Sequence, residues 1–269
     1  MKIKDLRIYP VKSFAGSSLE EAELEARGFK NDRRWMLVDE HGRFISQREY
    51  PFLTLWRVKV DGNSLEFEHK KTGEVFVIDN VKATDGDLVD VEVWGTHFQA
   101  RLVEMKNDLL FQNLGVSARL VYMSDDTRRG IDPSYAKEDE EVSFADAYPY
   151  LITNTASLEV LSERLGEKLE MLRFRPNIVV ESNTPFVEDD WKIIRINQQQ
   201  FRIPKPCSRC VMITIDPQTT QKKPKVMETL AEFRKEGNKV LFGANAIWES
   251  HSNETAFVRV GDELTYLYE

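Results

Sequence analysis

The amino-acid sequence predicts a mostly β fold with α+β elements, in which an N-terminal β-barrel-like module precedes a second β-rich module with a few flanking helices. Short segments rich in Ile, Leu, Val and aromatic residues recur along the chain, and Gly and Asp turns separate them. Helical periodicity is scarce in the first hundred residues and appears only later. With 269 residues, the chain suits two domains, and we expect them over residues 1–110 and 111–269.

The N-terminal part contains strand-like segments joined by short turns. Residues 56–69 predict a β-hairpin, because alternating apolar residues flank the turn at Asp61-Gly62-Asn63. The other expected strands of this part cover residues 2–11, 33–40, 73–79 and 90–102.

The C-terminal part mixes helices with strands. Leu109, Leu110 and Leu114 predict a helix over residues 104–115, and a capped apolar stripe predicts the clearest helix over 154–170. A third helix is expected over 225–237, and residues 125–149 form a long polar loop. Strands are expected over residues 175–182, 191–197, 199–204, 210–216, 240–249 and 256–268.

Composition narrows the class of partner. The net charge of −8 argues against nucleic acid or an anionic membrane as the main partner. No stretch approaches the roughly 18 apolar residues of a membrane span, and the N-terminus lacks the apolar run of a signal peptide. Two cysteines in the whole chain favour free thiols in a reducing compartment, so we expect a cytoplasmic protein.

Both cysteines, Cys207 and Cys210, lie in the stretch "KPCSRCVMITIDP". A structural zinc site needs four Cys or His ligands, and the four histidines are scattered singly, so zinc is disfavoured. A redox dithiol needs a helix at the C-x-x-C motif, whereas the β-branched residues after Cys210 predict a strand. Two readings remain: two ordinary small residues on a turn, or one thiolate that anchors a metal whose other ligands come from a cofactor.

The neighbours of the cysteines favour the second reading. Pro204 and Pro206 stiffen the chain before the thiols, which fixes where they point. Arg209 supplies a cation that favours a thiolate or holds an anion, and Ser208 adds a hydrogen-bond donor.

Several motifs then resemble one known family. "IYPVKSFAG", "NDRRWMLVD", "RFRPNIVV", "CSRCVMITIDPQT" and "LFGAN" follow one another in the order seen in the MOSC (molybdenum cofactor sulfurase C-terminal) family. The chain resembles, more narrowly, the branch with an N-terminal MOSC β-barrel domain that includes the amidoxime-reducing proteins. The resemblance covers essentially the whole chain and implies that the second module is a MOSC β-barrel domain.

The resemblance implies a molybdenum–molybdopterin cofactor whose metal is held by the second cysteine of a C-x-R-C motif. Cys210 would be this metal ligand, and Arg209 would support it in catalysis. Arg, Lys and Asn suit a pterin, because it carries a phosphate and a heterocycle edge rich in donors and acceptors. At the family level the resemblance also carries an association with pyridoxal phosphate. The cofactor-binding positions that it implies are Lys12, Ser13, Arg33, Arg175, Asn177, Ser208, Arg209 and Asn245.

The function that the resemblance implies is reduction of N-hydroxylated or other N-oxygenated small molecules. Two cysteines are fewer than the four that a [2Fe–2S] cluster takes, so electrons would come from separate proteins of the ferredoxin or cytochrome/flavin-reductase type. Two alternatives stay open. The protein could be a molybdenum-cofactor carrier or sulfur-transfer protein in which a cysteine bears a persulfide, or a non-enzymatic adaptor.

Overall fold

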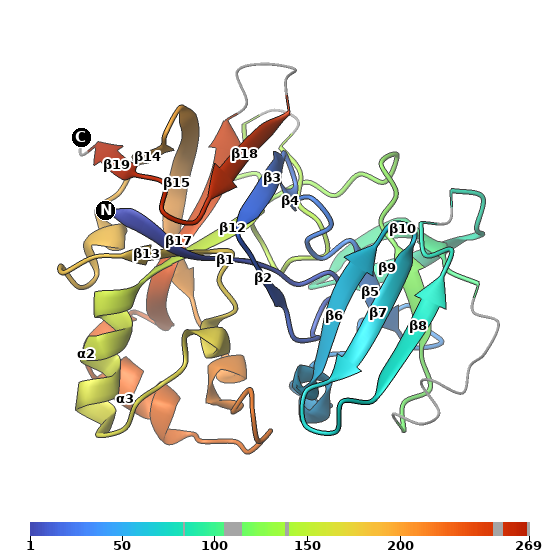
Figure 1. The fold of residues 1–269 in the computed structure, drawn as a ribbon, viewed down its shortest axis with the longest axis horizontal. Helices are drawn as coiled ribbons and strands as arrows, with labels where there is room; N and C mark the ends of the chain where they lie inside the picture. The colour runs from blue at the N-terminus through green and yellow to red at the C-terminus, as the bar shows by residue number, and fades with distance from the viewer. Residues whose placement is uncertain (83, 105–114, 138–139, 250–254, 268–269) are drawn as a thin grey trace. The chain divides into compact units, whose positions relative to one another are not determined.

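The structure is a computed structural model that describes residues 1–82, 84–104, 115–137, 140–249 and 255–267. Two compact units make up the chain, and each draws on the N-terminal residues (Figure 1). Unit 1 contains Met1–Ile8, Ser18–Lys30 and Tyr148–Glu269, and unit 2 contains Tyr9–Ser17 and Asn31–Ala147. The domain boundary expected after residue 110 lies outside the described residues. The mostly β fold class with few helices is confirmed.

Unit 1 is built on a nine-stranded sheet with the order β19-β14-β15-β17-β12-β13-β1-β2, in which β16 also pairs with β17. A three-stranded sheet, β18-β3-β4, completes its strands. The bounds are β1 Lys2–Ile8, β2 Ser17–Leu19, β3 Glu21–Glu25, β4 Gly28–Phe29, β12 Tyr150–Asn154, β13 Ile178–Glu181, β14 Ile193–Ile196, β15 Gln199–Ser208, β16 Lys235–Glu236, β17 Lys239–Glu249, β18 Ala256–Arg259 and β19 Leu264–Leu267.

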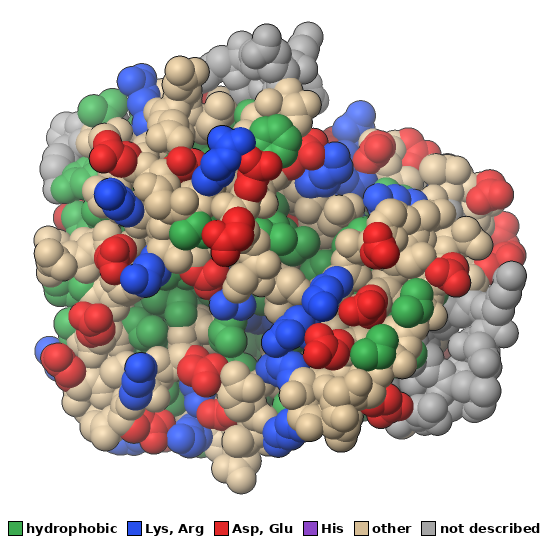
Figure 2. All heavy atoms as spheres, viewed as in Figure 1, with side chains coloured by type: hydrophobic (Ala, Val, Ile, Leu, Met, Phe, Trp, Pro, Cys, Tyr) green, Lys and Arg blue, Asp and Glu red, His purple; other side chains and the backbone are tan. Residues whose placement is uncertain are grey.

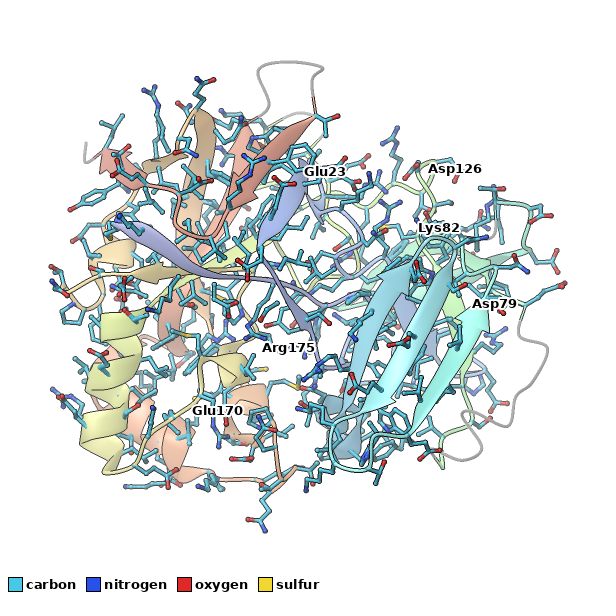
Figure 3. The ribbon with its side chains drawn as sticks, viewed as in Figure 1. Glu23, Asp79, Lys82, Asp126, Glu170 and Arg175 are labelled. Carbon is cyan, nitrogen blue, oxygen red and sulfur yellow. The ribbon has the colours of Figure 1, made fainter. Side chains whose placement is uncertain are left out.

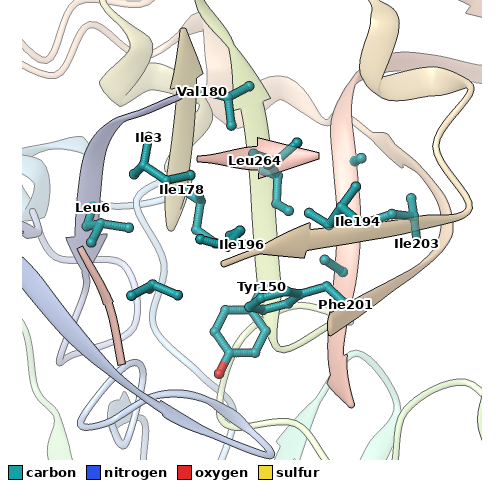
Figure 4. Packing of buried hydrophobic residues seen from close by; sticks show 14 of the residues in the cluster. Ile3, Leu6, Tyr150, Ile178, Val180, Ile194, Ile196, Phe201, Ile203 and Leu264 are labelled. Atoms are coloured by element: carbon teal, nitrogen blue, oxygen red, sulfur yellow. The ribbon is translucent and has the colours of Figure 1, made fainter. Parts of the chain in front are cut away.

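Alternation along these strands separates the two faces of the large sheet. One residue in two along β12, β13 and β17 enters a single apolar cluster, whose packing Figure 4 shows around Tyr150, Ile178 and Phe201. Because successive side chains in a strand point to opposite faces, the residues between them point away from this cluster. Asn245 lies between Ala244 and Ala246 of β17, so the alternation places it on the opposite face, and Asn177 directly precedes β13.

Two helices of unit 1 pack around a second apolar cluster. Helix α2 (Thr155–Leu165) begins at Asn154, whose side chain accepts a hydrogen bond from the Ala156 N–H at 3.0 Å, and ends at Gly166. Helix α3 (Lys225–Arg234) buries Val226 and Leu230. Both predicted helices are confirmed, with earlier ends than the sequence indicated. Three 3₁₀ turns lie nearby: η2 Met171–Phe174, η3 Val187–Asp189 and η4 Val211–Thr214.

The strand predicted over residues 210–216 is wrong, because β15 ends at Ser208 and residues 211–214 form η4. The β-branched residues there favour a strand, but two hydrogen bonds close a turn instead. The Ile213 N–H donates to the Cys210 carbonyl at 3.3 Å, and the Thr214 hydroxyl donates to the Val211 carbonyl at 2.7 Å. Ile213 is then buried in the cluster around the helices, so tertiary burial overrides the local β-propensity.

Unit 2 contains a four-stranded sheet, β5-β11-β10-β9, and a three-stranded sheet, β6-β7-β8. The predicted hairpin is confirmed, since β6 and β7 are joined by a two-residue loop between the paired Asp61 and Ser64. The helix predicted over residues 104–115 lies outside the described residues except at its two ends. The bounds are β5 Trp35–Val38, η1 Pro51–Leu55, β6 Trp56–Asp61, β7 Ser64–His69, β8 Val75–Asp79, β9 Leu88–Val93, β10 Thr96–Leu102 and β11 Arg119–Tyr122.

The surface carries charges of both signs. Figure 2 shows acidic and basic side chains interspersed over the visible face. Within the described part of the chain, no helix has the length and apolar character needed to cross a bilayer.

A buried carboxyl group, Glu188, lies beside the start of α2. Its two oxygens accept hydrogen bonds from the Ser157 hydroxyl at 2.8 Å and the Asn154 amide at 3.1 Å. Burial raises the pKa of this carboxyl, and these two hydrogen bonds oppose the shift only in part.

A carboxyl whose pKa is higher in the folded protein makes stability fall as pH rises through that folded pKa. We therefore expect Glu188→Gln to gain stability relative to wild type between about pH 4 and about pH 7. Urea unfolding at both pH values measures this difference. The exposed Glu232→Gln is the matched control, and the same pH trend in both variants would contradict the assignment to Glu188.

Candidate functional site

A row of residues crosses three neighbouring strands of unit 1 at the expected site and continues to Asn177, directly before β13. Leu151 in β12 pairs with Asn245 in β17, and Asn245 pairs with Lys205 in β15. On the other side of Leu151, the Asn177 N–H donates to the Leu151 carbonyl at 2.8 Å. The sheet therefore brings Asn177, Asn245 and the cysteine-bearing end of β15 into one region, although they lie far apart in sequence.

The Asn177 side chain binds main chain on both sides. Its oxygen accepts from the Leu151 N–H at 3.2 Å, and its amide donates to the Arg7 carbonyl at 3.2 Å. The residue is only 2% exposed, and the Arg7 N–H returns a hydrogen bond to its carbonyl at 2.8 Å. Asn177 thus fixes the positions of β1 and β12. A direct contact of Asn177 with a cofactor stays a prediction.

Gly243 sets the register between β15 and β17. Pro206 pairs with Ala244, but Ser208 pairs with Leu241, so β17 contains one extra residue at this point. Gly243 has φ +76°, and a Cβ atom there would lie 2.7 Å from the Ile152 carbonyl oxygen. The bulge therefore requires glycine, which explains this residue in the "FGAN" motif.

The two cysteines differ in their surroundings. The Arg209 guanidinium donates to the Cys207 sulfur at 3.0 Å and to the Phe174 carbonyl at 2.6 Å. It also lies over the Phe174 ring, which stacks on Phe242 with centroids 3.9 Å apart. Arg209 thus holds the sulfur of Cys207, the cysteine to which the resemblance assigns no metal.

Cys210 is exposed, and among the described residues its sulfur has no hydrogen-bond partner. The Arg209 N–H makes the last backbone hydrogen bond between β15 and β17, donating to the Val240 carbonyl at 2.7 Å. The chain then leaves the sheet, so Cys210 stands between the end of β15 and η4. Ser208, the last residue of β15, is also exposed.

The "RFRPN" motif places two arginines differently. Arg173 is buried, its guanidinium donates to the Asp216 carboxylate at 2.5 Å, and it also reaches the Ile213 and Thr214 carbonyls. It thereby anchors η4, the turn that follows Cys210. Arg175 is half-buried and ends η2 with a left-handed backbone, and Figure 3 labels it together with Glu170, which precedes the same turn.

In unit 2, Lys12 lies in a buried cluster of charges. Its ammonium donates to the Phe144 carbonyl at 2.8 Å and to the Asp146 carboxylate at 2.5 Å. Arg129 donates to the carbonyls of Ser143 and Ala145, both at 2.6 Å, and so holds the end of the predicted polar loop.

Arg33 and Ser13 belong to the same unit. The Arg33 guanidinium donates to the Asp32 carboxylate at 2.6 Å and lies over the Tyr9 ring, 4.2 Å from its centroid. Ser13 is buried beside Lys12 in the turn closed by the Phe14 N–H and the Val11 carbonyl.

The charges of this cluster shift one another's pKa values. Burial lowers the pKa of the Lys12 ammonium, the Asp146 carboxylate opposes this, and Arg129 and Arg33 add to it. Burial likewise lowers the pKa of Arg129 to about 10. Lys12 and the other nearby donors hold the pKa of the Asp146 carboxyl well below its usual range.

Three of the predicted site residues have strained backbones. Ser13, Arg33 and Arg175 have φ values of 72°, 48° and 55°, in the left-handed region that residues other than glycine seldom adopt. Such conformations persist where the surroundings hold them, and they concentrate at functional sites.

Sequence reasoning missed three residues that organise these regions: Arg173, Arg129 and Asp146. Arg173 lies inside the "RFRPN" motif, so this motif could have indicated the residue. Arg129 and Asp146 lie in a polar loop whose sequence has no periodicity. Among the described residues, no group of three or more His, Cys, Asp or Glu side chains is arranged to hold a metal ion.

Comparison with known proteins confirms the protein family that the sequence motifs indicated. Residues 139–265 match the MOSC domain, and residues 1–116 match the MOSC N-terminal beta barrel domain. The chain belongs to the MOSC family, in the form that carries this N-terminal domain.

Particular relatives cover most of the chain. It is similar to mitochondrial amidoxime-reducing component 1 of Xenopus laevis, with 30% identity over 97% of this chain and 80% of that protein. It is 31% identical to mitochondrial amidoxime reducing component 2 of Homo sapiens, over 86% of this chain and 72% of that protein. It is also 27% identical to the molybdenum cofactor sulfurase of Arabidopsis thaliana, over 97% of this chain and 35% of the sulfurase.

The bulge at Gly243 yields a prediction. Gly243→Ala should lower the free energy of unfolding by about 2–3 kcal/mol, because a left-handed alanine is strained and its Cβ meets the Ile152 carbonyl. Gly237→Ala is the matched control, since Gly237 has φ +56° but has no neighbouring atom within 4 Å of an added Cβ. Urea unfolding compares the two, and equal losses would contradict the close approach at Gly243.

Proposed function

We propose that the protein binds a molybdenum–molybdopterin cofactor and reduces N-hydroxylated or other N-oxygenated small molecules with electrons from separate partner proteins. The observation that carries the proposal is the asymmetry of the thiols. Arg209 holds the Cys207 sulfur, whereas the Cys210 sulfur is exposed directly after the arginine. The similarity to amidoxime-reducing components supports the reaction class.

The residues of unit 1 fit such a cofactor. The Arg209 Nε–H is buried and has no hydrogen-bond partner among the described residues, so it can donate to a ligand. A soft thiolate sulfur at Cys210 suits molybdenum as it suits other soft metals. Ser208 and Asn245 would add donors beside it. When bound, the cofactor would supply two-electron chemistry at the metal.

The chain's own residues would bind and orient the ligand. Arg173 and Gly243 fix the segments on either side of Cys210, so the thiol is positioned by buried contacts rather than by a loose loop. Lys12 and Arg33, which belong to unit 2, are also proposed as cofactor-binding residues, because a phosphate group suits their positive charge. Arg175 and Ser13 are proposed as further cofactor contacts.

The electron donors are proposed to be proteins of the ferredoxin or cytochrome/flavin-reductase type.

The two cysteines are both free, which suits a reducing compartment such as the cytoplasm.

A second candidate function is cofactor carriage or sulfur transfer. The similarity to the Arabidopsis molybdenum cofactor sulfurase over 97% of this chain favours it. In this case a cysteine thiolate would take the outer sulfur of a persulfide on another protein, and the thiolate of that protein would leave.

The ligand assignment predicts opposite behaviour for the two cysteines. Cys210→Ala should lower the bound molybdenum by at least about 10-fold, because removal of a thiolate ligand removes the bond that anchors the metal. Cys207→Ser should keep its molybdenum. Metal and pterin analysis of protein purified from a cofactor-producing host measures both.

Molybdenum retained in Cys210→Ala would refute the ligand assignment. Turnover of benzamidoxime with a chemical electron donor then separates a reductase from a carrier. A wild-type protein that holds molybdenum, reduces no N-hydroxylated compound and accepts a cyanide-labile sulfur would favour the second function.

A further inference from the structure

Arg209 is held within unit 1 at its backbone and at both terminal nitrogens of its guanidinium. Its main-chain N–H donates to the Val240 carbonyl at 2.7 Å. One terminal nitrogen donates to the Cys207 sulfur at 3.0 Å, and the other donates to the Phe174 carbonyl at 2.6 Å. Because a guanidinium is planar and rigid, these two bonds also set the direction of its Nε–H. This Nε–H is the buried donor that has no hydrogen-bond partner among the described residues.

Cys207 presents its sulfur to Arg209 as a hydrogen-bond acceptor. The side chain is half-buried, and its thiol donates to the Ser208 carbonyl at 3.8 Å. The lone pairs of the sulfur are therefore available to the guanidinium. A side chain without an acceptor atom at position 207 could not hold Arg209 in this way.

The Phe174 carbonyl connects the "CSRC" motif to the "RFRPN" motif. It belongs to the peptide unit before Arg175, whose backbone has the left-handed φ of 55°. Arg209 therefore also holds the peptide that leads into a second proposed cofactor residue. The neighbouring Arg173 donates to carbonyls of the η4 turn. Consecutive residues of η2 thus hold the segments before and after Cys210.

We infer that Cys207 is a positioning residue for cofactor binding. Its sulfur holds the Arg209 guanidinium so that the Nε–H is directed at an acceptor atom of the cofactor, and Arg209 in turn keeps the peptide before Arg175 in place. Cys207 acts through the arginine and does not bind the metal. This role rests on the proposed function, because the group that receives the Nε–H belongs to the proposed cofactor.

The chemistry required at position 207 is that of an acceptor and not that of a metal ligand. Serine keeps an acceptor oxygen, whereas valine fills the space with methyl groups and accepts no hydrogen bond. Loss of a residue that orients a ligand-binding side chain typically lowers metal affinity by about 10–100-fold. Valine and serine at position 207 should therefore behave differently.

The test compares Cys207→Val and Cys207→Ser in protein purified with its cofactor. On dialysis, Cys207→Val should release molybdenum and pterin at least about 10-fold faster than wild type, whereas Cys207→Ser should release them at the wild-type rate. Ser162→Val is the matched control. The half-buried Ser162 makes hydrogen bonds that stay within residues 158–169 of the described chain, so its loss should lower stability without faster release.

The melting temperature of the cofactor-free variants separates positioning from packing. Equal release rates for Cys207→Val and wild type, with or without a lower melting temperature, would overturn the positioning role. Faster release from Ser162→Val as well would attribute the effect to a general loss of stability, and would overturn that role too.

A readout without the cofactor follows the Arg209 side chain itself. In NMR spectra of the arginine Nε–H groups, wild type should give a resolved Arg209 resonance, identified by its loss in Arg209→Lys. Cys207→Val should broaden or remove this resonance, and Cys207→Ser should keep it. A resonance that is missing in wild type, or unchanged in Cys207→Val, would contradict the hold of Cys207 on the guanidinium.

The two proposals fail in different ways. Wild-type protein that holds no molybdenum refutes the proposed function. Normal molybdenum in wild type, with an unchanged rate of release from Cys207→Val, refutes only the positioning role of Cys207.

Discussion

The close approach of β17 to β12 at Gly243 is the constraint on which the cysteine region depends. No side chain fits between the Gly243 Cα and the Ile152 carbonyl, so β17 bulges there and gains one residue over β15. This offset sets which residues of β15 face Asn245, whose amide reaches the Pro206 carbonyl at 3.3 Å. The backbone hydrogen bonds between this stretch and β17 end at Arg209, and the exposed Cys210 follows.

Buried cations are the second organising feature of this acidic protein. A buried charge is costly unless it is paired or hydrogen-bonded, and each of these cations has partners from its own chain. Arg129 donates to carbonyls, and Arg173 donates to the Asp216 carboxylate and to two carbonyls, so both fix loops, which is a structural task. Lys12 instead pairs with the Asp146 carboxylate, whose side chain is 64% exposed, so this ion pair lies at the surface of unit 2. Arg129 and Arg173 therefore hold the fold, whereas Lys12 is the cation of this set that we propose for a ligand.

Local signals in the sequence predicted the local structure well. The hairpin at residues 56–69 and the helix after Asn154 follow from a turn and a cap that neighbouring residues specify. The η4 turn and the bulge at Gly243 depend on contacts with segments distant in sequence, so β-branched residues after Cys210 wrongly indicated a strand. Motif resemblance indicated the family and the candidate residues, but it did not predict that Asn177 binds main chain on both sides.

Backbone strain is shared by three of the candidate site residues. Glycine or asparagine would relieve the left-handed φ at Ser13, Arg33 and Arg175, since each larger side chain costs of order 1–2 kcal/mol there. For the two arginines, a fork of charged donors is what glycine or asparagine would lack. Strain alone does not identify a site, because Phe186 has φ 59° and packs against the apolar cluster around α2 and α3. The strain at the arginines therefore counts only together with their donors, which is why their contact with a ligand is proposed from their chemistry.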